Sequence, residues 1–377
     1  MSAIVTLIWS AACFLLIIGP LIFIHELGHY FVGRWCGVRA EAFSIGFGRE
    51  AFGWTDRRGT RWKLCWLPLG GYVRFAGDMG PASAPSPEWL ALPAAERAQT
   101  FQAKAVWQRF LIVFAGPAVN FLFAFAVAAM IIASYGEPFT PPMVAGVQPG
   151  SGAAKADLRP GDVILSLNDH DVRRFEDIRE YTFLRPNGAI TVRLLRQGRV
   201  LDTVAHTRVD VVTDNFGNLM QRGVLGIMPS AETMRPVPLV KVPVRAGQLI
   251  YQMLRTTITT LHQVVVGERS VKEMSGPIGV ARIAGQQVTL GWFAIVALMA
   301  GISVNLGFIN LLPIPMLDGG HLLFYLVEAV RRKPVEAAVQ EWAFRSGLAL
   351  VLGLMLFVTF NDLGSIGLWQ RLAGLIG

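Results

Sequence analysis

The chain has 377 residues, of which 53% are hydrophobic and 16% charged, and its mean hydropathy is +0.46. These values argue against a soluble enzyme or a disordered chain and favour a polytopic membrane protein. The net charge of +8 does not indicate a nucleic-acid partner, because the basic residues flank apolar segments and form no continuous cluster. We therefore expect a lipid bilayer as partner.

The first predicted element is a transmembrane helix over residues 1–33. No Lys or Arg precedes Arg34, and no convincing small-residue cleavage site follows the apolar run, so we interpret this segment as a retained helix and not as a signal peptide. Near its end stands His25-Glu26-Leu27-Gly28-His29. On a helix, His-Glu-x-x-His is a signature of zinc hydrolases.

The spacing within this motif has a chemical reason. His25 and His29 lie one helical turn apart on the same face, so both imidazoles can reach one metal ion. A catalytic zinc usually has three protein ligands and a water, and Glu26 is placed to take a proton from that water as general base. The alternative, two structural histidines on a buried face, would leave polar groups in hydrocarbon at high cost.

Residues 34–105 form the first predicted loop, which carries ten Lys and Arg residues. The N-terminal end of the first helix carries none, so the positive-inside rule places this loop in the cytoplasm. Within it, Phe43–Phe75 is rich in Gly, Trp and β-forming residues and predicts a β-hairpin that dips toward the active site. A substrate peptide could add to the edge of that hairpin as a further strand.

A second transmembrane helix is predicted over residues 106–135, which hold no charge between Phe110 and Ser134. The next segment, residues 138–212, alternates short apolar runs with Gly, Pro and Asp turns, which predicts a small β-rich domain outside the cytoplasm. Within it, Leu158–Asn168 resembles part of a PDZ domain, and Ile190–Leu194 fits a later strand. The resemblance implies a partner that is an extended peptide or a C-terminus.

Two positions depart from the usual PDZ pattern, since Asp157 and Asp169 stand where glycine or Asn-Gly is common. The alternative for this domain is a spacer without a ligand. Residues 213–290 are predicted to be a linker with one amphipathic helix. From Val240 to Val266 the apolar residues recur at helical spacing, so we expect this helix to lie on the outer membrane surface or against the spans.

The third transmembrane segment is predicted over residues 291–327. It contains Asn310-Leu-Leu-Pro-Ile-Pro-Met-Leu-Asp318-Gly-Gly-His321, whose prolines and glycines break a helix. Asp318 is the natural third metal ligand, and His321 is its rival. Counted along an inbound helix at 1.5 Å per residue, Asp318 lies deep, near the cytoplasmic side, as His25 does.

A fourth transmembrane helix is predicted over residues 343–369. The preceding loop carries Arg331, Arg332 and Lys333 and is therefore expected in the cytoplasm. Both termini are then extracytoplasmic, and the active site is near the cytoplasmic side. Of the three cysteines, Cys13 lies within the first span, and Cys36 and Cys65 are expected in the reducing cytoplasm. Their spacing matches no zinc pattern, so we interpret all three as structural.

The two metal motifs together resemble those of the site-2 protease family of intramembrane zinc metalloproteases. Further matches are Pro68–Arg74, similar to the family's membrane-associated hairpin, Ala115–Asn120, similar to its second-span motif, and Ser275–Ala281 before the third span. The arrangement resembles the regulator-of-sigma-E protease (RseP) branch, of whose two tandem PDZ domains only one is found here. This branch implies a bacterial inner-membrane location.

The resemblance implies a Zn²⁺ cofactor bound by His25, His29 and Asp318, with Glu26 as general base. It also implies that Asn310, Gly70 and Gly71 contact the substrate. The expected function is cleavage of transmembrane segments of single-pass proteins, above all an anti-sigma factor after an earlier site-1 cut, or remnant signal peptides. The PDZ-like domain would exclude substrates that are still bulky.

Two other classes of function remain open. One is a PDZ-containing membrane scaffold with a structural metal, for which Glu26 would be dispensable. A closed structural zinc site needs no base, which argues against this class. The other is a metal or ion transporter, which would need a polar path across the bilayer. The predicted second and fourth spans contain almost no ionisable residues.

Overall fold

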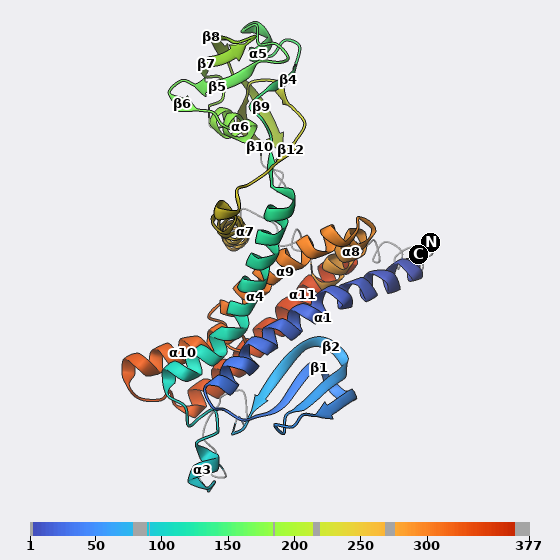
Figure 1. The fold of residues 1–377 in the computed structure, drawn as a ribbon, viewed down its shortest axis with the longest axis vertical. Helices are drawn as coiled ribbons and strands as arrows, with labels where there is room; N and C mark the ends of the chain where they lie inside the picture. Colours follow the sequence, from blue (N-terminus) through green and yellow to red (C-terminus); the bar gives the residue numbers. More distant parts are fainter. Residues whose placement is uncertain are drawn as a thin grey trace. The chain divides into compact units, whose positions relative to one another are not determined.

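The computed structural model describes residues 3–77, 89, 91–183, 185–213, 219–267 and 276–365 (Figure 1). The chain divides into two compact units. The first comprises residues 1–128, 246–261 and 271–377, and the second comprises residues 129–245 and 262–270.

Four of the described helices are long and apolar enough to cross a membrane. They are α1 (Ala3–Trp35), α4 (Val106–Tyr135), α9 (Trp292–Leu311) and α11 (Ala337–Ser365). This agrees with the predicted four-helix membrane architecture. The last helix begins before the predicted residue 343, and residues 366–369 of that prediction lie outside the described residues.

The predicted third segment, residues 291–327, is two helices joined by a turn. Helix α9 ends at Leu311, and α10 (Asp318–Arg331) begins seven residues later. Pro313 and Pro315 lack the backbone N–H that a continuing helix requires, and Met316 adopts a φ of 84°. A count of uninterrupted helical rise therefore does not describe the path to Asp318, because the chain turns before reaching it.

Two glycines allow the first turn of α10 to pack tightly on this connection. A Cβ atom on Gly319 would overlap the carbonyl oxygens of Leu311 and Leu312, and one on Gly320 would lie 2.6 Å from the carbonyl oxygen of Ile314. Real side chains do not tolerate such distances. The Asp-Gly-Gly sequence thus places the carboxylate at the first residue of α10.

A long β-hairpin lies along α1 (Figure 1). Its strands β1 (Ala40–Thr55) and β2 (Arg61–Phe75) pair antiparallel with several irregularities of register. At its turn the Asp56 carboxylate accepts hydrogen bonds from the backbone N–H groups of Arg58 and Thr60. The hairpin predicted over Phe43–Phe75 is therefore present, while its association with a membrane stays a prediction.

A hydrophobic core joins the hairpin to α1, α4 and α10. Tyr30 of α1, Phe43 of β1, Ile112 of α4 and Tyr325 of α10 are all buried in it. A short helix α3 (Ala94–Arg97) lies in the segment between β2 and α4. The core fixes the position of the hairpin against the helix that carries the His-Glu-x-x-His motif.

Two further helices belong wholly or largely to the first unit. Helix α7 (Val242–Val265), preceded by the 3₁₀ turn Leu239–Lys241, is the amphipathic helix predicted from the apolar stripe. Helix α8 (Pro277–Thr289) packs against α1 and was not predicted. The buried carboxylate of Asp362 in α11 accepts hydrogen bonds from the N–H groups of Gly276 and Gly279, at the start of α8.

The second unit is built on an antiparallel four-stranded sheet of order β6-β5-β7-β8. The strands are β5 (Val163–Leu167), β6 (His170–Asp171), β7 (Ala189–Arg196) and β8 (Arg199–His206). Helices α5 (Gly152–Lys155) and α6 (Phe175–Phe183) also belong to the unit. Its buried core includes Leu158, Ile164 and Ile190, and β7 contains the strand predicted over Ile190–Leu194.

The predicted boundary at residue 212 is too early. Strand β9 (Arg208–Thr213) pairs with β10 (Leu219–Val224), β11 (Ile227–Pro229) with β4 (Val144–Val147), and β12 (Thr233–Arg235) with β3 (Glu137–Phe139). Residues 219–235 are thus part of the second unit and not of a linker, because backbone pairing with earlier strands ties them to it.

Candidate active site

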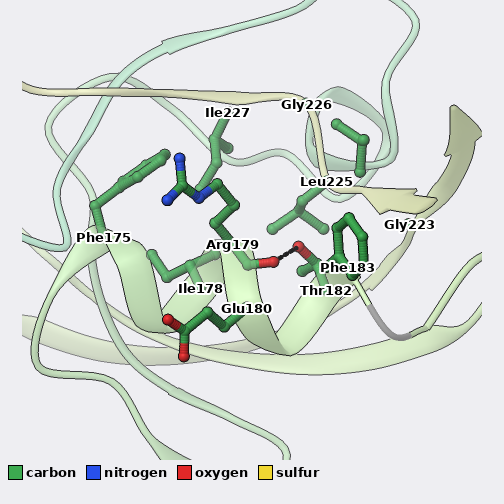
Figure 2. A pocket seen from close by; sticks show the side chains of 11 residues that line it. Phe175, Ile178, Arg179, Glu180, Thr182, Phe183, Gly223, Leu225, Gly226 and Ile227 are labelled. Carbon is green, nitrogen blue, oxygen red and sulfur yellow. Dashed lines mark hydrogen bonds between the residues drawn. The ribbon is translucent and has the colours of Figure 1, made fainter. Parts of the chain in front are cut away.

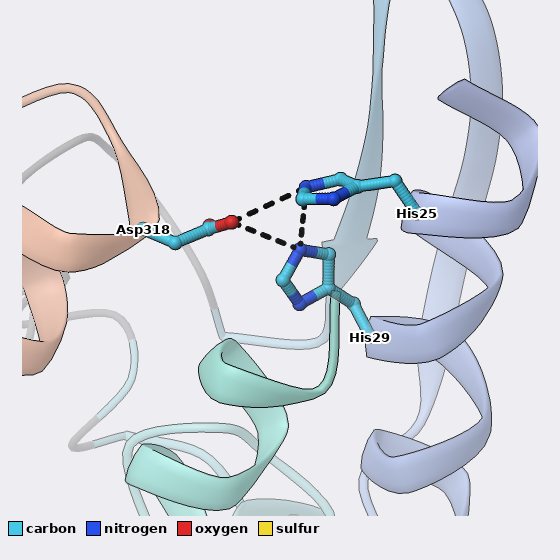
Figure 3. A group of neighbouring side chains, drawn as sticks. All are labelled: His25, His29 and Asp318. Carbon is cyan, nitrogen blue, oxygen red and sulfur yellow. Dashed lines mark hydrogen bonds and ion pairs between the residues drawn. The ribbon is translucent and has the colours of Figure 1, made fainter. Parts of the chain in front are cut away.

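Three predicted ligands from distant parts of the chain meet at one point (Figure 3). Nε2 of His25 lies 3.2 Å and Nε2 of His29 lies 3.6 Å from Oδ2 of Asp318. The two Nε2 atoms are 3.3 Å apart. Among the described residues, this is the group of His, Cys, Asp and Glu side chains that could hold a metal ion.

The donor atoms suit zinc. Two imidazole nitrogens and one carboxylate oxygen, all within 4.8 Å of one another, form a three-ligand set of the kind found in catalytic zinc sites. Oδ2 of Asp318 is buried, and in the described part of the chain its printed contacts are those with the two imidazole nitrogens. Both histidines are also buried, with at most 9% of their surface exposed. Buried polar atoms converging in this way are costly unless a cation binds them.

Helix α4 holds the other ring nitrogen of each histidine. Nδ1 of His29 lies 2.9 Å from the carbonyl oxygen of Ile112, and Nδ1 of His25 lies 3.0 Å from the side-chain amide of Asn120. Between them, a Cβ atom on Gly116 would overlap Nε2 of His29. The three positions follow one another at intervals of four residues, so they share one face of α4.

Glu26 lies beside the metal group and against the hairpin. Its side chain is buried, and the backbone N–H of Val73 in β2 donates a hydrogen bond to it. A Cβ atom on Gly71 would lie 2.9 Å from Cγ of Glu26 and 2.8 Å from the carbonyl oxygen of Ser44. The backbone of β2 can therefore approach the carboxylate closely only because residue 71 is glycine.

A cavity of about 610 Å³ contains this group. Among the residues lining it are Glu26, the three converging side chains, and the predicted substrate contacts Asn310, Gly70 and Gly71. Nδ2 of Asn310 lies 3.5 Å from Nε2 of His25. All seven side chains and glycines singled out from the sequence thus line one space.

His321, the rival ligand, lines the same cavity but is not part of the metal group. Its ring packs against Phe344, with the ring centroids 4.6 Å apart. As the fourth residue of α10, it is separated from Asp318 by nearly one helical turn. The structure therefore favours Asp318 over His321 as the third donor.

Sequence reasoning missed the roles of Gly116 and Asn120. Both stand in the segment Ala115–Asn120, whose sequence resembles the second-span motif of the family. A usable signal was present: Gly and Asn four residues apart in an otherwise apolar helix form a gap and a polar group on one face. What the sequence could not show is that this face turns toward α1.

The second unit has a cavity of its own, of about 670 Å³ (Figure 2). Helix α6 forms one side, with Ile178, Thr182 and Phe183, and residues 223–227 form the other. Arg179 and Glu180 also line it. We call this cavity the α6 groove.

Comparison with known proteins agrees with the geometry of the metal group. The sequence profile described as "Peptidase family M50" matches residues 13–354. A protein of Agrobacterium fabrum named as a candidate zinc metalloprotease is 42% identical, over 94% of this chain and 95% of its own length. A similarly named protein of Rhizobium meliloti is 43% identical, over 94% of this chain and 96% of its own.

A third relative, the metalloprotease MmpA of Caulobacter vibrioides, is 38% identical over 96% of this chain and 97% of its own length. These matches cover nearly the whole chain, including α1, α4, α9 and α10. They agree with the apolar helices and with a donor set that suits zinc. The chain therefore belongs to peptidase family M50, the site-2 protease family, and is a membrane zinc metalloprotease.

Proposed function

We propose that this metalloprotease is an intramembrane endopeptidase that cleaves transmembrane segments of single-pass membrane proteins. The observation that carries the proposal is the convergence of His25, His29 and Asp318 beside Glu26, in a cavity lined by helices apolar enough to span a bilayer. Ionisable groups in such helices are expensive and are retained for function.

In this proposal His25, His29 and Asp318 hold the zinc ion. When bound, zinc supplies Lewis acidity, which lowers the pKa of water and polarises the scissile carbonyl. Glu26 accepts a proton from the attacking water as the C–O bond forms, and returns it to the amide nitrogen as the C–N bond breaks. The amide of Asn310, close to His25, is placed to hold the substrate backbone.

A substrate helix must unwind before it can be cut, because its carbonyls are held in hydrogen bonds. The hairpin edge near Gly70 and Gly71 lines the same cavity and offers backbone groups to an extended peptide. We propose that a substrate strand adds there. This explains why a β-hairpin accompanies a site built on helices.

The hairpin also carries large exposed apolar side chains: Phe52, Trp54, Trp66 and Leu67 each expose more than half of their surface. Such a cluster marks contact with a membrane or a protein. We propose that it dips into the cytoplasmic surface of a bacterial inner membrane, with both termini on the opposite side, as the distribution of Lys and Arg favours.

The second unit is proposed to be a PDZ-like domain that binds an extended peptide or C-terminus in the α6 groove, beside residues 223–227. Its position in the chain, between α4 and α7, suits a filter that delays substrates whose outer domain is still present. An anti-sigma factor trimmed by an earlier protease, or a remnant signal peptide, fits such a filter.

The test is the Glu26→Gln variant of the full chain, purified in detergent, with its zinc content measured. Cleavage of a model transmembrane substrate should fall by about 10²- to 10⁴-fold while zinc stays bound. Glu41→Gln is the matched control, since Glu41 is a partly exposed partner of Arg74 on the hairpin. Wild-type cleavage by the Glu26 variant would overturn the assignment of Glu26 as general base.

A further inference from the structure

His25 is bound on both sides of its ring. Its Nε2 faces Asp318, and its Nδ1 lies 3.0 Å from the amide nitrogen of Asn120. The Asn120 side chain is completely buried, and its Oδ1 has no hydrogen-bond partner in the described part of the chain. Buried polar atoms normally have a hydrogen-bond partner. The amide of Asn120 could face Nδ1 of His25 with either its nitrogen or its oxygen.

The tautomer of His25 decides that question. A neutral imidazole carries one proton, and the nitrogen without it is the one that binds metal. If the amide nitrogen donates to Nδ1, the proton must be on Nε2, and Nε2 has no lone pair for zinc. A half-turn about the Cβ–Cγ bond of Asn120 exchanges its oxygen and nitrogen in nearly the same space.

We propose that Asn120 is a positioning residue whose Oδ1 accepts a hydrogen bond from Nδ1–H of His25, thereby keeping the Nε2 lone pair directed at the metal. This inference rests on the proposed role of His25 as a zinc ligand. It gives the orphaned oxygen a partner and supplies the outer hydrogen bond that orients metal-binding histidines.

The neighbouring ligand supports this assignment. His29 has its Nδ1 2.9 Å from the carbonyl oxygen of Ile112, a group that can only accept, so His29 must carry its proton on Nδ1. The two Nε2 atoms, which are 3.3 Å apart, then both direct a lone pair at the proposed metal position. One face of α4 thus serves both histidines, through a backbone carbonyl for His29 and a side chain for His25.

Asn120 is itself held in place by its surroundings. The Ser303 hydroxyl of α9 donates a hydrogen bond of 2.9 Å to the backbone oxygen of Asn120, and both residues are completely buried. This contact joins α4 to the helix that leads toward Asp318. The amide therefore stands on a backbone fixed between α1 and α9.

The experiment compares Asn120→Asp with Asn120→Leu in the full chain purified in detergent. Asp keeps the acceptor and loses the donor, while Leu has similar size and neither group. Zinc affinity, measured by competition with a chromophoric chelator, should fall about 10- to 100-fold in N120L. In N120D it should equal or exceed that of the wild type.

Asn305→Leu is the matched control, because the Asn305 side chain bonds Thr257 and does not line the metal cavity. It should bind zinc as the wild type does. Two results would overturn the inference: wild-type affinity in N120L, or affinity in N120D as low as in N120L. If N120L does not fold, the protonation of Nδ1 of His25 can still be compared between N120D and the wild type by NMR of ¹⁵N-labelled histidine.

In zinc-loaded protein the His25 signal, identified by its loss in His25→Ala, should show a protonated Nδ1, and its proton should move downfield in N120D. A deprotonated Nδ1 would overturn the inference. The same His25→Ala variant tests the underlying assignment. If His25→Ala binds zinc as tightly as the wild type, the proposed ligand set is wrong. If His25→Ala binds zinc weakly but N120L binds it with wild-type affinity, only the role of Asn120 is refuted.

Discussion

The two compact units use polar side chains in opposite ways. In the first, buried and partly buried polar groups gather around one point, where His25, Glu26 and Asp318 line a common cavity. In the second, ion pairs such as Arg193–Asp202 lie spread over an exposed surface. Exposed pairs contribute little to stability, so most single charge changes there should be mild. Changes around the metal group should instead remove activity.

Among changes that act through packing alone, the largest effect is expected from Gly116→Ala. A Cβ atom there would overlap Nε2 of His29, so either the ring or α4 must move. Because misplacing a catalytic group by about 1 Å costs roughly 100-fold in rate, cleavage should fall at least that far. Zinc affinity, measured by chelator competition, should fall as well.

Gly19→Ala is the control for that variant, since a Cβ atom on Gly19 in α1 would have nothing within 4 Å. It should retain both zinc and activity. Full zinc binding by Gly116→Ala would mean that the α1–α4 contact is adaptable and that the close approach at Gly116 does not define the site.

A smaller effect, about tenfold in kcat, is expected from Gly71→Ala. The added Cβ would press on Cγ of Glu26 and on the carbonyl oxygen of Ser44, and so shift the carboxylate without touching the ligands. Zinc affinity should therefore remain that of the wild type. A parallel loss of zinc would show that the hairpin supports the metal and not the base.

The same contrast separates what the sequence could predict from what it could not. His25, Glu26 and His29 lie within five consecutive residues, so their spacing on a helix is enough to predict two metal ligands and a base from the sequence alone. Asp318 followed from a second motif, although its placement depends on a turn with Met316 at positive φ, which helical rise cannot describe. The role of Asn120 depends on which face of α4 meets α1, and that is fixed only by packing.

In the second unit the sequence predicted the strands rich in β-branched residues but not where the unit ends. Strands β11 and β12 are three residues each, too short to show a pattern, and they pair with strands far earlier in the chain. Asp157, noted as standing where glycine is common, does adopt a φ of 56°. Hydrogen bonds from Arg159 and Arg196 to its side chain accompany this conformation.

One charge pair in the second unit differs from the exposed pairs described above, because its carboxylate is buried. The Asp162 side chain is 1% exposed and accepts two hydrogen bonds of 2.7 Å from Arg196. Burial alone would raise the pKa of Asp162, but the hydrogen bonds from Arg196 and from the backbone N–H of Arg159 outweigh burial and lower it. Asp162→Asn should therefore destabilise this unit by about 2 kcal/mol at neutral pH.

The pH dependence gives this prediction its sign. Because folding lowers the pKa of Asp162, its contribution is complete above the ordinary aspartate pKa of about 4 and is lost as pH falls through the lower, folded value. Hydrogen exchange of β5 and β7 in the full chain should thus separate wild type from variant at pH 7 and bring them together in acid. Asp202→Asn, in an exposed pair, should change exchange little.

The smallest effect is expected in the α6 groove. Phe183 lines it and exposes 37% of its surface, so Phe183→Ala should remove a contact for a bound peptide without opening the core. Truncating such a contact typically costs about 1 kcal/mol, or roughly fivefold in affinity. If the groove filters substrates, cleavage rates should change for a substrate with its extracytoplasmic segment and stay constant for one without it. Equal changes for both substrates would instead mean that Phe183 affects the protease as a whole. The first unit could then not be assigned to catalysis and the second to substrate recognition.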